Sequence, residues 1–498
     1  MANGSPSSSS PLILGLDVGT SMSKTAIFEL GDFAAPLVVA RRASVTTAPR
    51  PGWSEADPDA LLAKLFECIR EVTAQVDADR IAVVGLSGTA CGAWLLGSDN
   101  RPVRPAVLWN DGRSADILER WSDSGFLDTV FERSGNMPFP GYTLPTLVWL
   151  SENEPERLRE AETVVFCKDW VRLALTGVVS SEETDASYVP FDIAKREWDT
   201  ELFEGAGVGE LTRLLPELKP PTITDPLLAD IALSLGLPAG IPVAVGATDI
   251  ITGLVGAGAV VPGRAVTILG TSANSSLVTS EPEFRPHGVG IMAAGPLGTY
   301  ARTMINTSGS TTLDWAANLL AGGQVDRLVE LASASQDGAD LPVLVPYLSP
   351  AGVVSPHPDP HARGTISGLR FDHSPADLAR AAIEGLALAV ADSFQCMATT
   401  VTELVAVGGA SRSDLLLQTI ADASGSVVHR PHGEEFGARG AALLAAHSVG
   451  LFDDAELSRV AENLAIERTF EPVAQRISHK LDRYRGVRDA TAALWRTW

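Results

Sequence analysis

The chain has 498 residues, of which 45% are hydrophobic and 20% charged, a composition usual for a globular protein with room for two or more domains. Its 61 Asp and Glu outnumber its 38 Lys and Arg, which gives a net charge of −23. This balance argues against general binding to nucleic acids or anionic membranes, although it leaves room for a local site that binds an anion.

The first residues, MANGSPSSSS, are small and polar. They lack the basic and apolar regions of a signal peptide, so we expect residues 1–10 to form a disordered lead. No stretch reaches the roughly 18 apolar residues of a membrane helix. The four cysteines are scattered without a C-x-x-C pair, which favours reduced thiols over a zinc site or disulfides. These features predict a cytoplasmic protein without a membrane or nucleic-acid partner.

Strands and one helix make up the pattern of the next segment. LILGLDVG, KTAIFEL and PLVVARRASV are typical of an antiparallel meander. The amphipathic stretch DPDALLAKLFECIREVTAQV predicts a helix with Asp57 as its N-cap and Pro58 in its first turn. IAVVGLSG then reads as a buried strand, and the region from about residue 109 to 200 as mostly helical.

The opening pattern returns in the second half of the chain. AVTILGTSANSSLVTS, at 265–280, again predicts a strand, a Gly-Thr-Ser turn and a second strand. After it we expect a helix over 311–320, a loop-rich section over 345–366, a long helix over 374–397 and a strand that ends in glycines at 403–409. Two similar halves indicate an internal duplication with a cleft between the copies.

Asp17 stands inside the first apolar strand, and only Val18 separates it from the turn Gly19-Thr20-Ser21. One interpretation is that Asp17 starts or caps the turn, as Asp often does. The other is that its carboxylate faces a cation while the backbone N–H groups and hydroxyls of the turn hold phosphate. The second copy of the turn, Gly270-Thr271-Ser272, favours a phosphate group held from both sides of a cleft.

Three further motifs each have a structural and a functional interpretation. Asp249, in GATD, is either the N-cap of the following helix or a general base that takes a proton from a substrate hydroxyl. The glycines of VGGASRS at 407–413 and EEFGARGAA at 434–442 either make tight turns or form a slot for adenine and ribose.

The chain resembles the FGGY family of carbohydrate kinases, in the ATPase superfamily that includes actin and hexokinase. The motifs that carry the resemblance occur in family order: GLDVGTSMSK, GWSEADP, LWNDGRS, CKDWVRLALTG, GATD, LGTSANSSLV, VGGASRSDLLLQTIAD and EEFGARGAA. The resemblance implies an α/β protein with two actin-like, ribonuclease H-like ATPase domains, at 11–255 and 256–498. It also implies a kinase that uses ATP and Mg²⁺, with substrate bound mainly by the N-terminal half and ATP mainly by the C-terminal half.

The resemblance also implies roles for individual residues. Asp17 would act through Mg²⁺ on the ATP phosphates, and Asp249 would be the general base. The other implied contacts are, for phosphate, Gly19, Thr20, Ser21, Lys24, Gly270, Thr271 and Ser272; for adenosine, Gly408, Gly409 and Ala410; and for the substrate, Trp109, Asn110, Asp111 and Arg113.

The substrate-side residues after the GLSG strand depart from one branch of the family. Thr89, Ala90 and Cys91 stand where D-xylulose kinases carry Gln, Met and His, which argues against D-xylulose. The surrounding sequence looks more like the branch of L-xylulose-type and erythritol-type kinases. We therefore expect a small ketose or polyol as the substrate.

Other interpretations remain open at this stage. The chain could be a non-catalytic relative, such as a sugar sensor or a chaperone-like ATPase, but it keeps Asp249 and both Gly-Thr-Ser turns. Family members are often homodimers, and no interface is visible in the sequence.

Three isolated polar residues have structural interpretations. His357 and His361 have metal-like spacing but are expected in a solvated loop, and Asp185 is expected to cap a helix. Close packing within the protein explains the small residues at 253–263 better than a dimer face does.

Overall fold

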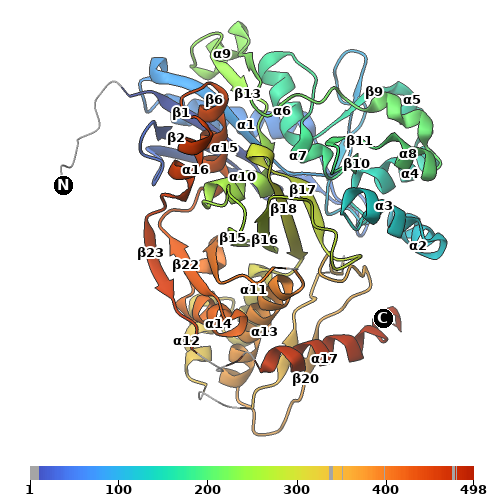
Figure 1. Ribbon diagram of the computed structural model, residues 1–498, viewed down its shortest axis with the longest axis vertical. Helices are drawn as coiled ribbons and strands as arrows, with labels where there is room; N and C mark the ends of the chain where they lie inside the picture. Colours follow the sequence, from blue (N-terminus) through green and yellow to red (C-terminus); the bar gives the residue numbers. More distant parts are fainter. Residues whose placement is uncertain are drawn as a thin grey trace.

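The computed structural model describes residues 10–335, 340–349, 352–397, 399–473, 477 and 479–497. The expected disordered lead therefore lies, apart from residue 10, outside the described residues, as do positions 350 and 351 of the loop-rich section. The chain folds into two α/β halves, one above the other in Figure 1. Within the described ranges, no helix is both long and apolar enough to cross a membrane.

A mixed sheet forms the core of the N-terminal half. Its strand β1 (Leu12–Val18) pairs antiparallel with β2 (Met22–Glu29) and parallel with β6 (Ile81–Gly88). Strand β3 (Val38–Ala43) continues the antiparallel meander, which confirms the expected order. The sheet also contains β12 (Thr224–Pro226), β13 (Pro242–Ala244) and β14 (Ala247–Thr248).

Helices and small sheets surround this core. Helix α1 (Pro58–Thr73) begins where predicted, because the Asp57 carboxylate accepts hydrogen bonds from the first free backbone N–H groups. The region from 109 to 200 is mostly helical, as expected. The helices of this half after α1 are α2 (Ala115–Ser124), α3 (Phe126–Ser134), α4 (Thr143–Asn153), α5 (Pro155–Glu160), α6 (Cys167–Thr176), α7 (Glu183–Ala186), α8 (Thr200–Gly205), α9 (Ala229–Leu235) and α10 (Asp249–Gly256). The short strands are β4 (Thr46–Thr47), β5 (Glu55–Ala56), β7 (Trp94–Gly97), β8 (Ala106–Val107), β9 (Ala161–Val165), β10 (Phe191–Asp192) and β11 (Glu197–Trp198).

The second half repeats the arrangement. Strands β15 (Ala265–Leu269) and β16 (Ala273–Thr279) are antiparallel and flank the second Gly-Thr-Ser turn, as predicted. Strand β21 (Glu403–Val407) lies parallel to β15, as β6 lies parallel to β1. The sheet is completed by β17 (Ile291–Ala294), β18 (Tyr300–Asn306), β22 (Val427–Pro431) and β23 (Ile466–Phe470). Outside it lie β19 (Val343–Val345), β20 (Thr365–Ser367), α11 (Ser310–Leu320), α12 (Val325–Ser333), α13 (Pro375–Gln395), α14 (Asp414–Ser424), α16 (Asp454–Glu462) and α17 (Lys480–Ala492).

Helix α15 (Phe436–Ser448) comes late in the sequence but packs on the N-terminal sheet, so Figure 1 shows its red ribbon beside the blue strands. A Cβ on Gly15 of β1 would lie 2.2 Å from the Ala438 carbonyl oxygen, and one on Gly85 of β6 only 2.1 Å from that of Ala441. Only glycine permits such close packing. Helix α10 also packs tightly on α15, which confirms the close-packing interpretation of its small residues.

Candidate active site

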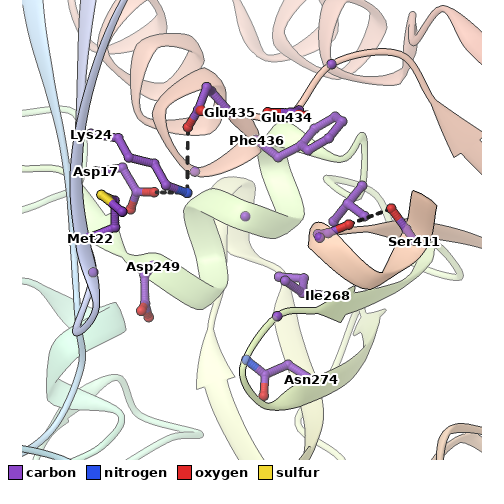
Figure 2. A pocket seen from close by; sticks show the side chains of 18 of the residues that line it. Asp17, Met22, Lys24, Asp249, Ile268, Asn274, Ser411, Glu434, Glu435 and Phe436 are labelled. Atoms are coloured by element: carbon purple, nitrogen blue, oxygen red, sulfur yellow. Dashed lines mark hydrogen bonds and ion pairs between the residues drawn. The ribbon is translucent and has the colours of Figure 1, made fainter. Parts of the chain in front are cut away.

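A cavity of about 680 Å³ opens between the two halves and is lined by residues of both. Figure 2 shows Asp17 and Lys24 on one side, Glu435 and Phe436 at the start of α15, and Asp249 at the start of α10. The cavity therefore brings together residues that lie far apart in the sequence.

Asp17 occupies the penultimate position of β1 and lines this cavity. Its Oδ1 accepts a hydrogen bond of 3.0 Å from the Ser87 hydroxyl, and its Oδ2 lies 3.8 Å from the Lys24 ammonium. Burial raises the pKa of the Asp17 carboxyl above its ordinary value, although Lys24 and Ser87 act to lower it. A buried carboxylate whose cationic partner is 3.8 Å away keeps the capacity to coordinate a metal ion.

The first Gly-Thr-Ser turn follows Asp17 after one intervening residue, Val18. Its Gly19 N–H donates to the Met22 carbonyl at 3.1 Å, and the Gly19 carbonyl accepts from the Ser44 hydroxyl at 2.8 Å. Gly19 and Ser21 line the large cavity, whereas Thr20 lines a second cavity beside it. The hydroxyl of Thr20 accepts a hydrogen bond of 2.7 Å from the Trp109 indole, so the turn is joined to the loop predicted to bind the substrate.

Asp249 is the first residue of α10 and lines both cavities. Thr248, not Asp249, occupies the N-cap position of the helix, so the helix-capping interpretation of Asp249 is wrong. Burial, followed by the nearby Asp17 carboxylate, raises the pKa of Asp249 to about 7, against the lowering effect of the Ile250 and Asp249 backbone N–H groups. A carboxylate with such a pKa is suited to accept a proton near neutral pH.

The second Gly-Thr-Ser turn faces the first across the cavities. Gly270 lines the large cavity, and Thr271 and Ser272 line the second. The turn is fixed from behind, because the Ser310 N–H donates to the Gly270 carbonyl at 2.7 Å and the Gly309 N–H donates to the Thr271 carbonyl at 2.8 Å.

The far end of the large cavity is lined by the two glycine-rich motifs. Gly408 has a φ of +96°, and a Cβ there would lie 2.7 Å from the Leu269 carbonyl oxygen. Gly408 and Gly409 line the cavity, whereas Ala410 is buried behind them. Glu434, Phe436 and Gly437 line it from the second motif, so the two predicted adenosine segments meet.

The second cavity, of about 270 Å³, is also lined by residues of both halves, and Asp249 is one of them. Of the predicted substrate residues, Ala90, Cys91, Trp109 and Asn110 line it. Thr89 does not; its N–H donates to the Val18 carbonyl at 3.1 Å. The described residues that line this cavity are Thr20, Ser21, Ala90, Cys91, Trp109, Asn110, Phe139, Tyr188, Asp249, Ile250, Thr271, Ser272, Asn274, Ile291 and Ile305.

Asp111 and Arg113 point away from both cavities. Arg113 Nε and Nη2 donate to the two oxygens of Asp111 at 2.8 and 2.9 Å, and Nη2 also donates to Glu55 at 2.7 Å. The Arg113 guanidinium lies over the Trp53 ring, 4.0 Å from its centroid. The Asp111 carboxylate and the Nε and Nη2 groups of Arg113 are therefore engaged inside the N-terminal half, whereas the buried Arg113 Nη1 has no hydrogen-bond partner among the described residues.

The sequence interpretation missed several residues of the site. Asn274 lines both cavities, and Phe139 and Tyr188 line the smaller one. Asn274 lies two residues after the second turn, which was a usable signal in the sequence, whereas no local motif marked Phe139 or Tyr188. Glu435 was present in a quoted motif but was given no role; its carboxylate lies 3.6 Å from the Lys24 ammonium.

Two other expectations concern isolated polar residues. Asp185 lies inside α7, and Glu182 caps that helix instead, so the capping prediction for Asp185 is wrong. His361 pairs with Glu119 at 3.2 Å. Among the residues placed by the structure, no group of three or more His, Cys, Asp or Glu side chains is arranged to hold a metal ion.

Comparisons with known proteins agree with this geometry. Residues 12–256 match the N-terminal domain and residues 265–449 the C-terminal domain of the "FGGY family of carbohydrate kinases". The chain is 33% identical over 481 residues to the xylulose kinase of Escherichia coli (strain K12), covering 93% of this chain and 95% of that protein. It is 29% identical over 513 residues to the erythritol kinase of Brucella abortus (strain 2308), covering 98% and 97%. A crystal structure of a "xyloylose kinase" from Brucella ovis superposes with a TM-score of 0.87 at 30% identity, covering 97% of this chain and all of that one.

Proposed function

The chain belongs to the FGGY family of carbohydrate kinases, and on that premise we propose that it phosphorylates a small neutral ketose or polyol with Asp249 as the general base. It is an ATP-using sugar or polyol kinase with the two-domain, actin-like α/β fold of that family. The observation that carries the proposal is the position of Asp249, on the wall shared by the two cavities.

The character of the smaller cavity supports a neutral substrate. Its described lining residues include no Lys, Arg or His, so a sugar acid or sugar phosphate would find no cationic partner there. Apolar side chains such as Phe139, Ile291 and Ile305 form much of the wall, beside polar groups of Asn110, Tyr188 and Asn274. This combination suits a short chain of carbon atoms with hydroxyls, of the xylulose or erythritol type.

The residues around the large cavity fit a nucleotide with Mg²⁺. Two Gly-Thr-Ser turns offer backbone N–H groups and hydroxyls to phosphate oxygens, and Lys24 adds positive charge. Asp17 supplies a buried carboxylate at the same place, and Mg²⁺ in such sites is usually held by one or two carboxylates together with phosphate oxygens. Bound Mg²⁺ would neutralise the charge of the phosphate groups.

The proposed division of labour assigns the substrate mainly to residues 11–255 and ATP mainly to residues 256–498. Asp249 would take the proton from the substrate hydroxyl as that oxygen attacks the terminal phosphate. Gly270, Thr271 and Ser272 would orient the phosphate groups from the opposite side. Approach of the two halves would exclude water, so that the sugar hydroxyl and not a water molecule is the acceptor.

The test is a coupled assay of ADP release with Mg²⁺ and ATP. The panel contains D- and L-xylulose, D- and L-ribulose, erythrulose, erythritol, xylitol, arabinitol, glycerol and gluconate. A strong response to one neutral compound supports the proposal and names the substrate. Preference for gluconate would overturn the neutral class, and silence with ATP still bound would favour a non-catalytic sugar sensor.

A further inference from the structure

A buried charged cluster lies behind Asp249, in the N-terminal half, and lines neither the nucleotide cavity nor the substrate cavity. The Lys168 ammonium of α6 lies 2.6 Å from Asp169, 3.2 Å from Glu182 and 2.8 Å from Asp185. All four side chains are at most 1% exposed. Removing each of these charged groups from water costs several kcal/mol before ion pairing offsets it. A cluster of four such groups therefore needs an explanation in terms of what it positions.

The cluster holds the short helix α7 in place. Glu182 accepts hydrogen bonds from the Thr184 N–H at 2.6 Å, from the Thr184 hydroxyl at 2.6 Å and from the Asp185 N–H at 3.1 Å. Because Lys168 contacts the same Glu182 carboxylate, the position of the Thr184 hydroxyl is fixed by charge-assisted contacts.

Thr184 connects this cluster to the catalytic helix. Its Oγ1 accepts a hydrogen bond of 2.9 Å from the backbone N–H of Thr248, the N-cap residue of α10 and the neighbour of Asp249. Since the Thr184 hydroxyl hydrogen is directed at Glu182, its lone pairs are directed at the Thr248 amide. Gly88 contacts both parts of this arrangement. It is the strand partner of Thr248, and a Cβ added to Gly88 would lie 2.8 Å from the backbone nitrogen of Lys168.

From these contacts we propose that Thr184 is a positioning residue for Asp249, oriented by the Lys168–Glu182 ion pair. Thr184 touches neither substrate nor nucleotide in this assignment; it fixes the backbone N–H of Thr248, the residue directly before Asp249. The inference rests on the proposed role of Asp249. It assigns a purpose to two segments that have no role in the proposed function, CKDWVR at 167–172 and EETDAS at 182–187.

The first test replaces Thr184 by Val, which keeps the shape of the side chain and removes the acceptor. We expect kcat for the sugar to fall by at least about tenfold, because small displacements of a reacting group reduce rates steeply. The KM for the sugar and the Kd for ATP should stay within about twofold of the wild type. Thr184→Ser, which restores the hydroxyl, should recover most of kcat.

A structural readout accompanies the kinetics. Exchange of the Thr248 amide hydrogen, followed by mass spectrometry or NMR, should be faster in Thr184→Val than in the wild type. The matched control is Thr419→Val, which removes another buried threonine hydroxyl, bonded to the Leu415 carbonyl at 2.6 Å in α14. This control should alter neither kcat nor exchange at Thr248.

The outcomes separate the two hypotheses. If Thr184→Val keeps wild-type kcat and wild-type exchange at Thr248, the positioning role is overturned while the kinase proposal stands. If the wild type phosphorylates nothing, the proposed function fails, and amide exchange still tests the hydrogen bond. Should Thr184→Val not fold, Thr184→Cys, similar in size and a poor acceptor, takes its place with the same expected results.

Discussion

The hydroxyl of Ser87 lies 2.7 Å from that of Thr252. Ser87 also donates to Asp17 at 3.0 Å, whereas Thr252 belongs to the helix that begins at Asp249. This pair of hydroxyls therefore links the Asp17 carboxylate to α10, the helix that carries Asp249, through one buried contact. The separation of the proposed metal-side carboxylate from the proposed base is set inside the N-terminal half, independently of how the halves move.

Replacement of Asp249 by Asn should abolish turnover while leaving nucleotide affinity near the wild-type value. The amide keeps the size of the side chain but cannot accept the proton, and a general base typically contributes about 10² to 10⁴ in rate. Coupled ADP release measures the activity, and calorimetry with ATP in Mg²⁺ buffer measures the binding. Near-normal turnover in this variant would show that another group is the base.

The pH dependence should report the raised pKa of Asp249. Because the base acts in its deprotonated form, kcat/KM for the sugar should increase as pH rises toward about 7 and level off above it. The Asp17 carboxylate contributes to the raised pKa, so the residual activity of Asp17→Asn should reach its plateau at lower pH. If the rise of kcat/KM with pH occurs at the same pH in Asp17→Asn as in the wild type, the electrostatic coupling between Asp17 and Asp249 is contradicted.

Trp109→Phe should weaken the connection between the substrate cavity and the first Gly-Thr-Ser turn. It removes the 2.7 Å hydrogen bond to Thr20, worth about 1 kcal/mol, so KM for the sugar should rise about fivefold. The matched control is Trp198→Phe, which loses an indole hydrogen bond of 3.0 Å to Pro216, a residue that lines neither cavity. Equal changes in KM for both variants would argue against a specific role of Trp109.

Arg113→Met should act on stability and not on substrate binding. The change leaves the buried Asp111 carboxylate without its ion-pair partner, whereas Glu55 keeps its pair with Arg104, and the loss costs about 3 to 5 kcal/mol in free energy of unfolding. Arg120→Met, which breaks an exposed pair with Glu152, should cost about 1 kcal/mol or less. Urea denaturation measures both. A stable Arg113→Met protein with a raised KM would restore the substrate role that the family resemblance implies.

Gly437→Ala should disturb Asp17 directly. A Cβ at this position in the first turn of α15 would lie 2.5 Å from Asp17 Oδ2, and the Ser87 hydrogen bond prevents that carboxylate from moving freely. We expect the affinity for ATP with Mg²⁺ to fall by about tenfold, in the usual range of overpacking. Gly486→Ala in α17, where an added Cβ meets nothing within 4 Å, is the control and should bind ATP normally.

Much of the fold follows from local patterns. The strands around Gly19-Thr20-Ser21 and Gly270-Thr271-Ser272 were predictable because apolar strands and small-residue turns are encoded within short segments. The large cavity could be anticipated for the same reason, since the duplication brings two such turns to one cleft. The Asp57 N-cap was also visible in the sequence.

The remaining features depend on contacts between distant segments. A polar loop that faces the substrate has the same sequence signature as one that turns inward, so the inward direction of Asp111 and Arg113 was not predictable. Likewise, only the tertiary structure brings Lys168 to Asp185 and gives that carboxylate an ion-pair partner in place of a helix-capping role.

Helix α15 has a consequence for how the chain can be divided. It lies against Gly15 of β1 and Gly85 of β6, so the sheet formed by the beginning of the sequence is completed by residues close to its end. A fragment that stops before residue 265 would expose the surface that Ala438 and Ala441 cover. Two fragments made separately would have to associate in trans to bury the apolar cluster that α15 forms with this sheet, which makes this protein a natural subject for fragment complementation.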